Sequence, residues 1–149
     1  MALFLSTFAN KIDAKGRVSV PVQFRASLVN PEFSGMILYE SFTSDCVEGC
    51  DIARIRKISE SIDNLDQFSN ERDSLAAALL GSCVQLTIDA DGRVILPENL
   101  LKKATISDVA VFVGKGSVFE IWEPKKLAEH MAKAKKDARS NINLLKVVK

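Results

Sequence analysis

The sequence is poor in the residue types on which most enzyme active sites depend. Only one of its 149 residues is histidine, three are cysteine, and tryptophan and tyrosine occur once each. It contains no Ser/His/Asp set, no phosphate-binding glycine loop and no dinucleotide-binding glycine motif, and no recognisable motif pairs two carboxylates. We therefore expect no enzymatic activity and no cofactor.

The three cysteines, Cys46, Cys50 and Cys83, do not complete a metal site. Cys46 and Cys50 have the spacing of half a site, but structural zinc needs four ligands, and the single histidine, His130, lies in a distant helical stretch. An odd number of cysteines in a chain without an export signal indicates reduced thiols. We interpret them as small apolar residues on strands and expect no metal.

Long apolar runs and a large charge excess are also missing. No stretch approaches the roughly 18 apolar residues of a membrane-spanning helix, and the short apolar start, residues 1–8, lacks the basic region and cleavage site of a secretory signal. These absences predict a cytoplasmic protein with no membrane partner. The net charge is only +1, so a surface for a polyanion would require local clustering of cations.

What the sequence does contain is an internal repeat. Residues 11–28 align with residues 87–104 without a gap, at an offset of 76 positions. The identical pairs are Ile12/Ile88, Asp13/Asp89, Ala14/Ala90, Gly16/Gly92, Arg17/Arg93, Val18/Val94 and Pro21/Pro97. Such self-similarity predicts two copies of one supersecondary unit.

Each copy has the local pattern of a strand, a turn and a second strand. Asp-Ala-x-Gly favours a tight turn, because glycine adopts positive φ freely and aspartate can accept hydrogen bonds from amides two residues on. Arg-Val-x-Val or Arg-Val-x-Leu then predicts a short strand, so the strand, the turn and this second strand are predicted to form a hairpin. Pro21 and Pro97 end that strand and start short helices over 22–28 and 98–104.

The similarity extends beyond the turns. Apolar segments predict strands at 36–39 and 45–50 in the first copy and at 109–113 and 117–122 in the second. Helical periodicity follows over 52–65 and from Pro124 onward, and another helix over 70–80 is flanked by Ser69 or Asn70 as a cap and by Gly81. The expected units are residues 1–66, a connecting helix at 67–81, residues 82–136, and a tail at 137–149. The fold class is α+β and rich in strands, with the halves sharing a barrel about a pseudo-two-fold axis.

Positive charge gathers in the first copy. Residues 11–28 hold four cations against one carboxylate, a net +3, whereas residues 87–104 hold three of each, a net of zero. The candidate residues for binding a polyanion such as DNA are Lys11, Lys15, Arg17, Arg25 and Arg93. Other interpretations stay open: each arginine of a turn could pair with the aspartate of that turn, and the lysines could simply be solvated.

The segment from Asp13 to Pro21 resembles the SpoVT–AbrB type of bacterial DNA-binding motif. Two copies in a chain of this length resemble the MraZ family of transcriptional regulators. The resemblance runs from about Phe4 to about Met131, and it also rests on Leu79-Leu80-Gly81 and on Phe119-Glu120-Ile121-Trp122.

The resemblance implies a duplicated swapped-hairpin AbrB-like barrel with flanking helices, assembled into a ring of several copies. It implies a nucleoid-associated repressor that binds short direct repeats of double-stranded DNA upstream of its own operon of division and cell-wall genes. Lys15 and Arg17 would contact the DNA. The second copy departs from the pattern, because Asp91 stands at the position of Lys15.

Two other functions compete with this one. The chain could be an oligomeric scaffold that binds only proteins, or an antitoxin-like module that binds both DNA and a partner protein. The clustering of Lys11, Lys15 and Arg17 favours the regulator, because a scaffold has no need of it.

Overall fold

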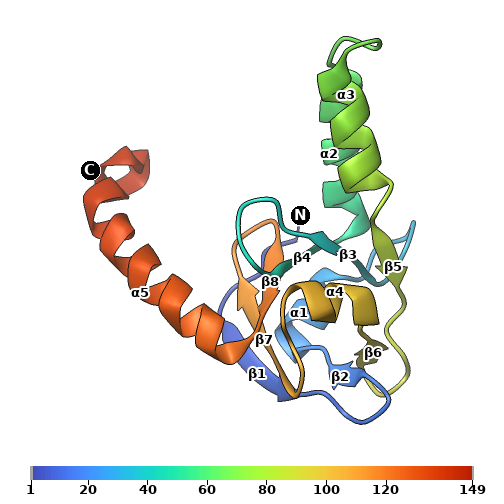
Figure 1. Cartoon of the computed structure of the whole chain (residues 1–149), viewed down its shortest axis with the longest axis vertical. Helices are drawn as coiled ribbons and strands as arrows, with labels where there is room; N and C mark the ends of the chain where they lie inside the picture. The colour runs from blue at the N-terminus through green and yellow to red at the C-terminus, as the bar shows by residue number, and fades with distance from the viewer. Residues whose placement is uncertain (1, 149) are drawn as a thin grey trace.

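The computed structural model describes residues 2–148 and shows the predicted mixture of strands and helices (Figure 1). The first repeat comprises β1 (Thr7–Lys11), β2 (Arg17–Ser19), α1 (Val22–Ser27), β3 (Met36–Glu40), β4 (Val47–Cys50) and α2 (Ile52–Asp63). The connecting segment comprises α3 (Asn70–Leu75) and a π-helical turn, η1 (Ala76–Leu80). The second repeat comprises β5 (Val84–Leu86), β6 (Arg93–Ile95), α4 (Glu98–Lys103), β7 (Val109–Gly114), β8 (Phe119–Trp122) and α5 (Pro124–Asn141), followed by the 3-10 turns η2 (Ile142–Leu144) and η3 (Lys146–Val148).

The two repeats exchange strands. One antiparallel sheet has the order β1-β7-β8-β4-β3-β5, and β2 pairs with β6 in a second, two-stranded sheet. The strand before each turn therefore pairs with the other repeat, β1 with β7 and β5 with β3. The simple hairpin expected around each turn is not formed, because both of its strands find partners in the other copy. The α+β class is confirmed, and among residues 2–148 the ladders do not close into a barrel.

A cluster of phenylalanines forms the centre of the core. Phe24 on α1 is fully buried, and its ring lies 5.2 Å from that of Phe4, 5.3 Å from that of Phe119 and 6.1 Å from that of Phe112. Leu100, the corresponding residue on α4, is buried in the same cluster. The short helices that follow the two prolines thus anchor both halves to one core.

The helices predicted at the ends of the repeats are present. Asp51 caps α2 and Ser69 caps α3, each accepting a hydrogen bond from a backbone N–H three residues on. α5 begins at Pro124, as predicted, and continues to Asn141. None of the described helices is long and apolar enough to cross a membrane.

The cysteines are packed as apolar residues. All three thiols are free, with Cys46 and Cys50 buried. Burial raises the pKa of each of these two thiols to about 12, which disfavours the thiolate that a metal would need. Within the described part of the chain, no three His, Cys, Asp or Glu side chains gather in a way that could hold a metal ion.

Candidate nucleic-acid interface

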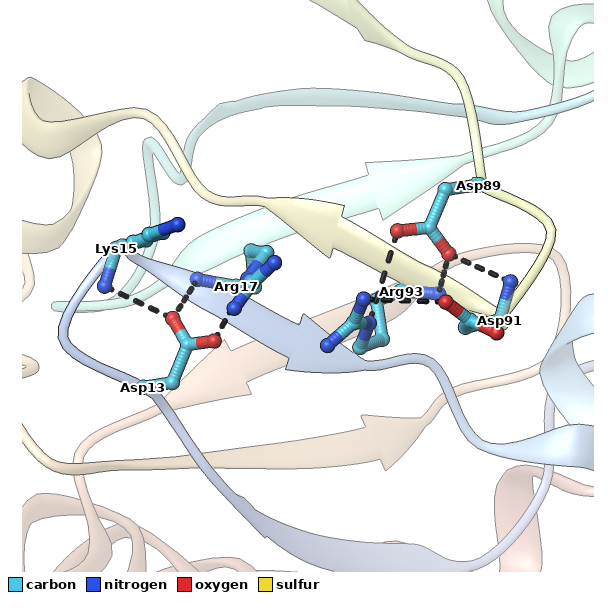
Figure 2. A network of polar contacts seen from close by, with 6 residues as sticks. All are labelled: Asp13, Lys15, Arg17, Asp89, Asp91 and Arg93. Atoms are coloured by element: carbon cyan, nitrogen blue, oxygen red, sulfur yellow. Dashed lines mark hydrogen bonds and ion pairs between the residues drawn. The ribbon is translucent and has the colours of Figure 1, made fainter.

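The two turns are built in the same way, and an aspartate holds each of them together. Asp13 Oδ1 accepts hydrogen bonds from the backbone N–H groups of Lys15 and Arg17, both at 2.9 Å. The second turn repeats both bonds at 2.9 Å, with Asp89 as the acceptor (Figure 2). The bond predicted from the aspartate to the amide two residues on is therefore confirmed in both copies.

Glycines let the chain reverse and bring the repeats together. Gly16 has φ +82° and Gly92 has φ +77°, in the left-handed region that favours glycine. The Gly16 carbonyl accepts from Leu96 N–H at 3.1 Å, and the Gly92 carbonyl accepts from Val20 N–H at 2.9 Å. These bonds and the β2–β6 ladder place the turns at opposite ends of one two-stranded ribbon, with the two turn arginines between them (Figure 2).

The first turn leaves more of its cations without a partner. Arg17 pairs with Asp13 through Nε, 2.7 Å from Oδ2, which is the structural interpretation left open by the sequence. Its two Nη atoms have no hydrogen-bond or ion-pair partner among residues 2–148, and neither has the Lys15 ammonium, whose side chain leads away from Asp13 (Figure 2). Arg17 can therefore form this ion pair and still offer its two Nη donor atoms to a ligand.

In the second turn, both aspartates interact with the arginine of the same turn. Arg93 Nη2 donates to Asp91 Oδ2 at 3.2 Å, and Arg93 Nε lies 3.6 Å from Asp89 Oδ2. Two carboxylates therefore surround one guanidinium, and one of them stands where the first turn has Lys15. This turn offers less positive charge to a polyanion than the first.

Arg25 belongs to the second turn, although it comes from the first repeat. Its half-buried guanidinium lies against Gly92, where an added Cβ would overlap Arg25 Nη1. Its Nε is buried and has no hydrogen-bond partner among the described residues. In the first turn the corresponding residue is Leu101, which lines an open cavity of about 550 Å³ together with Gly16.

The five predicted residues thus divide between the two turns. Lys11, at the exposed end of β1, leads into the first turn with Lys15 and Arg17, and Arg25 joins Arg93 at the second. Asn10 was not predicted: its Nδ2 donates to the Ser19 carbonyl at 2.8 Å and ties β1 to β2. It lies just outside the aligned repeat, next to Lys11, and no pattern in the sequence marked it.

The two glycines should respond differently to substitution. Gly16→Ala is expected to cost about 1–2 kcal/mol of folding free energy, the strain of a side chain at positive φ, because its Cβ would meet only ordinary contacts. Gly92→Ala should cost this same strain and a smaller added amount, because the Arg25 guanidinium, at the end of a flexible side chain, must move away from the new Cβ. Urea denaturation of both variants measures the difference, and a smaller loss for Gly92→Ala than for Gly16→Ala would contradict the prediction.

The aspartates of the turns should make stability depend on acid pH. The pKa of Asp13 lies below its ordinary value of 3.8, first because of the backbone N–H of Arg17 and then because of its guanidinium. The backbone N–H of Arg93 lowers the pKa of Asp89 in the same way. A carboxyl group with a lowered pKa in the folded state stabilises above its unfolded pKa, and this contribution is lost as the pH falls through the folded value.

We therefore expect the double variant Asp13→Asn, Asp89→Asn to be less stable than the parent by a constant amount above the ordinary aspartate pKa of 3.8. Below it, the difference should shrink. Unfolding midpoints measured from neutral to acid pH check this, and a difference that persists at the lowest pH would contradict it.

Comparison with known proteins gives a consistent result. A model of the MraZ protein family, whose description includes the term antitoxin-like, matches residues 79–143. The chain is 46% identical over 138 residues to a "Transcriptional regulator MraZ" of Rickettsia akari (strain Hartford), which covers 93% of each chain. It is 47% identical over 137 residues, 91% of each chain, to the protein of the same name in Rickettsia bellii (strain OSU 85-389).

Proposed function

The chain belongs to the MraZ family of transcriptional regulators, and from this premise we propose that it binds double-stranded DNA through its first turn. It is a regulator of transcription and not an enzyme. The observation that supports the proposal most strongly is that the Lys15 ammonium and the Arg17 Nη groups have no partner among residues 2–148, although Arg17 Nε pairs with Asp13.

These groups match the two parts of DNA recognition. The paired Nη atoms of a guanidinium can donate to O6 and N7 of one guanine in the major groove, and a two-stranded ribbon can carry them there. A lysine ammonium neutralises phosphate and positions the protein without reading sequence. On the second turn, Asp91 would repel phosphate, so we propose that Arg93 and Arg25 support binding in a lesser role, and that Lys11 adds charge beside the first turn.

One turn is too small to hold DNA tightly, so we propose that several copies act together. Copies joined in a homo-oligomer, arranged as a ring, would each place a first turn on one of several direct repeats, and the effective concentration would raise the affinity. We propose that occupancy represses the operon of division and cell-wall genes that contains this protein's own gene. The protein would then act in the cytoplasm, on the nucleoid.

A mobility-shift titration tests the proposal. The probe is the DNA upstream of the chain's own gene, with random DNA of equal length as competitor, across a series of salt concentrations. Binding that prefers the upstream DNA and weakens steeply with salt is expected, because each neutralised phosphate releases counterions. Absence of binding at low salt would reject the DNA-binding function.

An antitoxin-like module that binds a partner protein as well as DNA is the second candidate, and the term antitoxin-like in the family description favours it. A toxin gene beside this gene would support this candidate, whereas cell-wall genes downstream would support the regulator.

A further inference from the structure

Two helical arms extend from the body of the molecule and carry opposite charge. The acidic arm, residues 60–73, is the end of the α2–α3 hairpin and holds five carboxylates against one arginine, a net −4. The basic arm is α5, residues 124–141, with six lysines and arginines against two carboxylates, a net +4. Figure 1 shows the two arms leaving the body in different directions, with their free ends away from β2 and β6.

Within residues 2–148, neither arm packs against the body of the molecule over its outer part. α5 packs on the sheet only near its start, where Leu127 is buried against Trp122 and Val111 and Met131 adds a partial contact. Residues 135–147 are all exposed, and so are residues 63–68. A helix that packs on one side near its base gains little stability for the rest of its length, so the exposed parts of both arms offer surface for a partner.

Exposed apolar side chains lie at both free ends. On the acidic arm, Phe68 is 90% exposed and Leu65 is also exposed. Beyond the end of α5, Leu144 is 78% exposed and Ile142 and Leu145 are exposed beside it. Apolar groups surrounded by charge of one sign are typical of an interaction surface.

We propose that the acidic arm of one copy docks against the basic arm of a second copy. The charges are equal and opposite, and exposed apolar side chains lie on the acidic arm and just beyond the end of the basic arm. Among residues 2–148 no ion pair joins the two arms of one chain, and they diverge in Figure 1. This contact deepens the proposed function and rests on it, because it names the surface that holds the copies together.

Such a contact has a definite geometry. Each copy contacts one neighbour through its acidic arm and another neighbour through its basic arm. A contact between two different surfaces repeats from copy to copy and produces a closed ring or an open chain. The turns take no part in it, and they remain available to DNA.

Two variants with reversed charges test the contact without DNA. One carries Glu60→Lys and Glu71→Lys on the acidic arm, and the other carries Lys133→Glu and Lys136→Glu on the basic arm. Light scattering after gel filtration gives the mass of each at low salt. Each variant should associate at least about tenfold more weakly than the parent, because the two reversals cancel the net charge of the altered arm and remove its attraction to the oppositely charged arm of the next copy. Salt should reduce the difference. Glu98→Lys, an exposed reversal outside both arms, should leave the mass unchanged.

The mixture of the two variants provides the decisive measurement. Each variant keeps one unaltered arm, so an equimolar mixture should form complexes of both chains, whereas each variant alone stays dissociated. Circular dichroism first establishes that both variants are folded. A monomeric parent, variants of parental mass, or a mixture that stays dissociated would overturn the proposal. Because these masses are measured without DNA, the arm contact can fail while upstream DNA is still bound, and the reverse result would reject only the DNA function.

Discussion

Replacement of Phe24 by alanine should lower the free energy of unfolding by about 3–5 kcal/mol, the usual cost of removing a buried aromatic ring. Phe24 is 0% exposed and lies within 6.1 Å, between ring centroids, of four other phenylalanines. Its removal therefore leaves a cavity between α1 and the large sheet, and it also removes edge-to-face ring packing. This loss is a large share of the total stability of about 5–15 kcal/mol of a typical domain.

Urea denaturation at one fixed protein concentration measures the effect, because association would otherwise shift the midpoint. Phe42→Ala is the matched control: Phe42 is 60% exposed, and its loss should change stability by less than about 0.5 kcal/mol. Similar losses for the two variants would show that the phenylalanine cluster is not the centre of the core. Since α1 also carries Arg25, Phe24→Ala should loosen the support of the second turn as well.

Replacement of Arg17 by alanine should weaken binding to the upstream DNA by about 5- to 150-fold for each guanine that Arg17 reads, because a bidentate pair of hydrogen bonds to guanine contributes about 1–3 kcal/mol. Stability should fall by less than about 1 kcal/mol, since the Arg17–Asp13 pair is exposed and such pairs contribute little. Binding to random DNA should fall much less. Fluorescence anisotropy with both DNAs, at several salt concentrations, separates these effects.

The other turn offers a matched control for Arg17. Arg93→Ala removes the same side chain from the equivalent position, but that guanidinium already contacts two carboxylates. We expect its effect on specific binding to be smaller. Equal effects would show that both turns read the DNA alike. Arg17→Lys should keep the salt dependence and lose the preference for upstream DNA, because an ammonium cannot form the two parallel bonds of a guanidinium.

Most of the local structure follows from the sequence by short-range rules. Asp13 and Gly16 specify a turn whatever surrounds them, because one accepts nearby amide hydrogens and the other allows positive φ. Pro21 and Pro97 mark where helices begin, and Ser69 marks a cap. Strand pairing was harder to predict from the sequence. The apolar residues of β1 indicate a strand but do not indicate which strand it pairs with. The nearest candidate, β2, was the wrong partner.

The candidate nucleic-acid interface was also predictable only in part. The charge difference between the two turns is visible in the sequence, since Lys15 aligns with Asp91. The contact between Arg25 and the second turn is not visible in the sequence, because the Arg25 guanidinium lies against a glycine 67 positions away in the other repeat. The prediction that Arg25 lies on a helix does not reveal this contact. Only the exchange of strands between the repeats shows that Arg25 supports the second turn.

The sequence by itself determined the duplication, the two turns, the ends of the helices and the excess of cations in the first copy, because each of these depends on residues within a few positions of one another. Only the tertiary structure decided that the copies exchange strands, that Arg17 keeps two donors while Arg93 directs one to Asp91, and that two oppositely charged arms stand apart from the body. These features depend on which distant segments bury their apolar faces together and satisfy each other's hydrogen bonds. The packing of these segments minimises the free energy of the whole chain, so it cannot be predicted from any single segment.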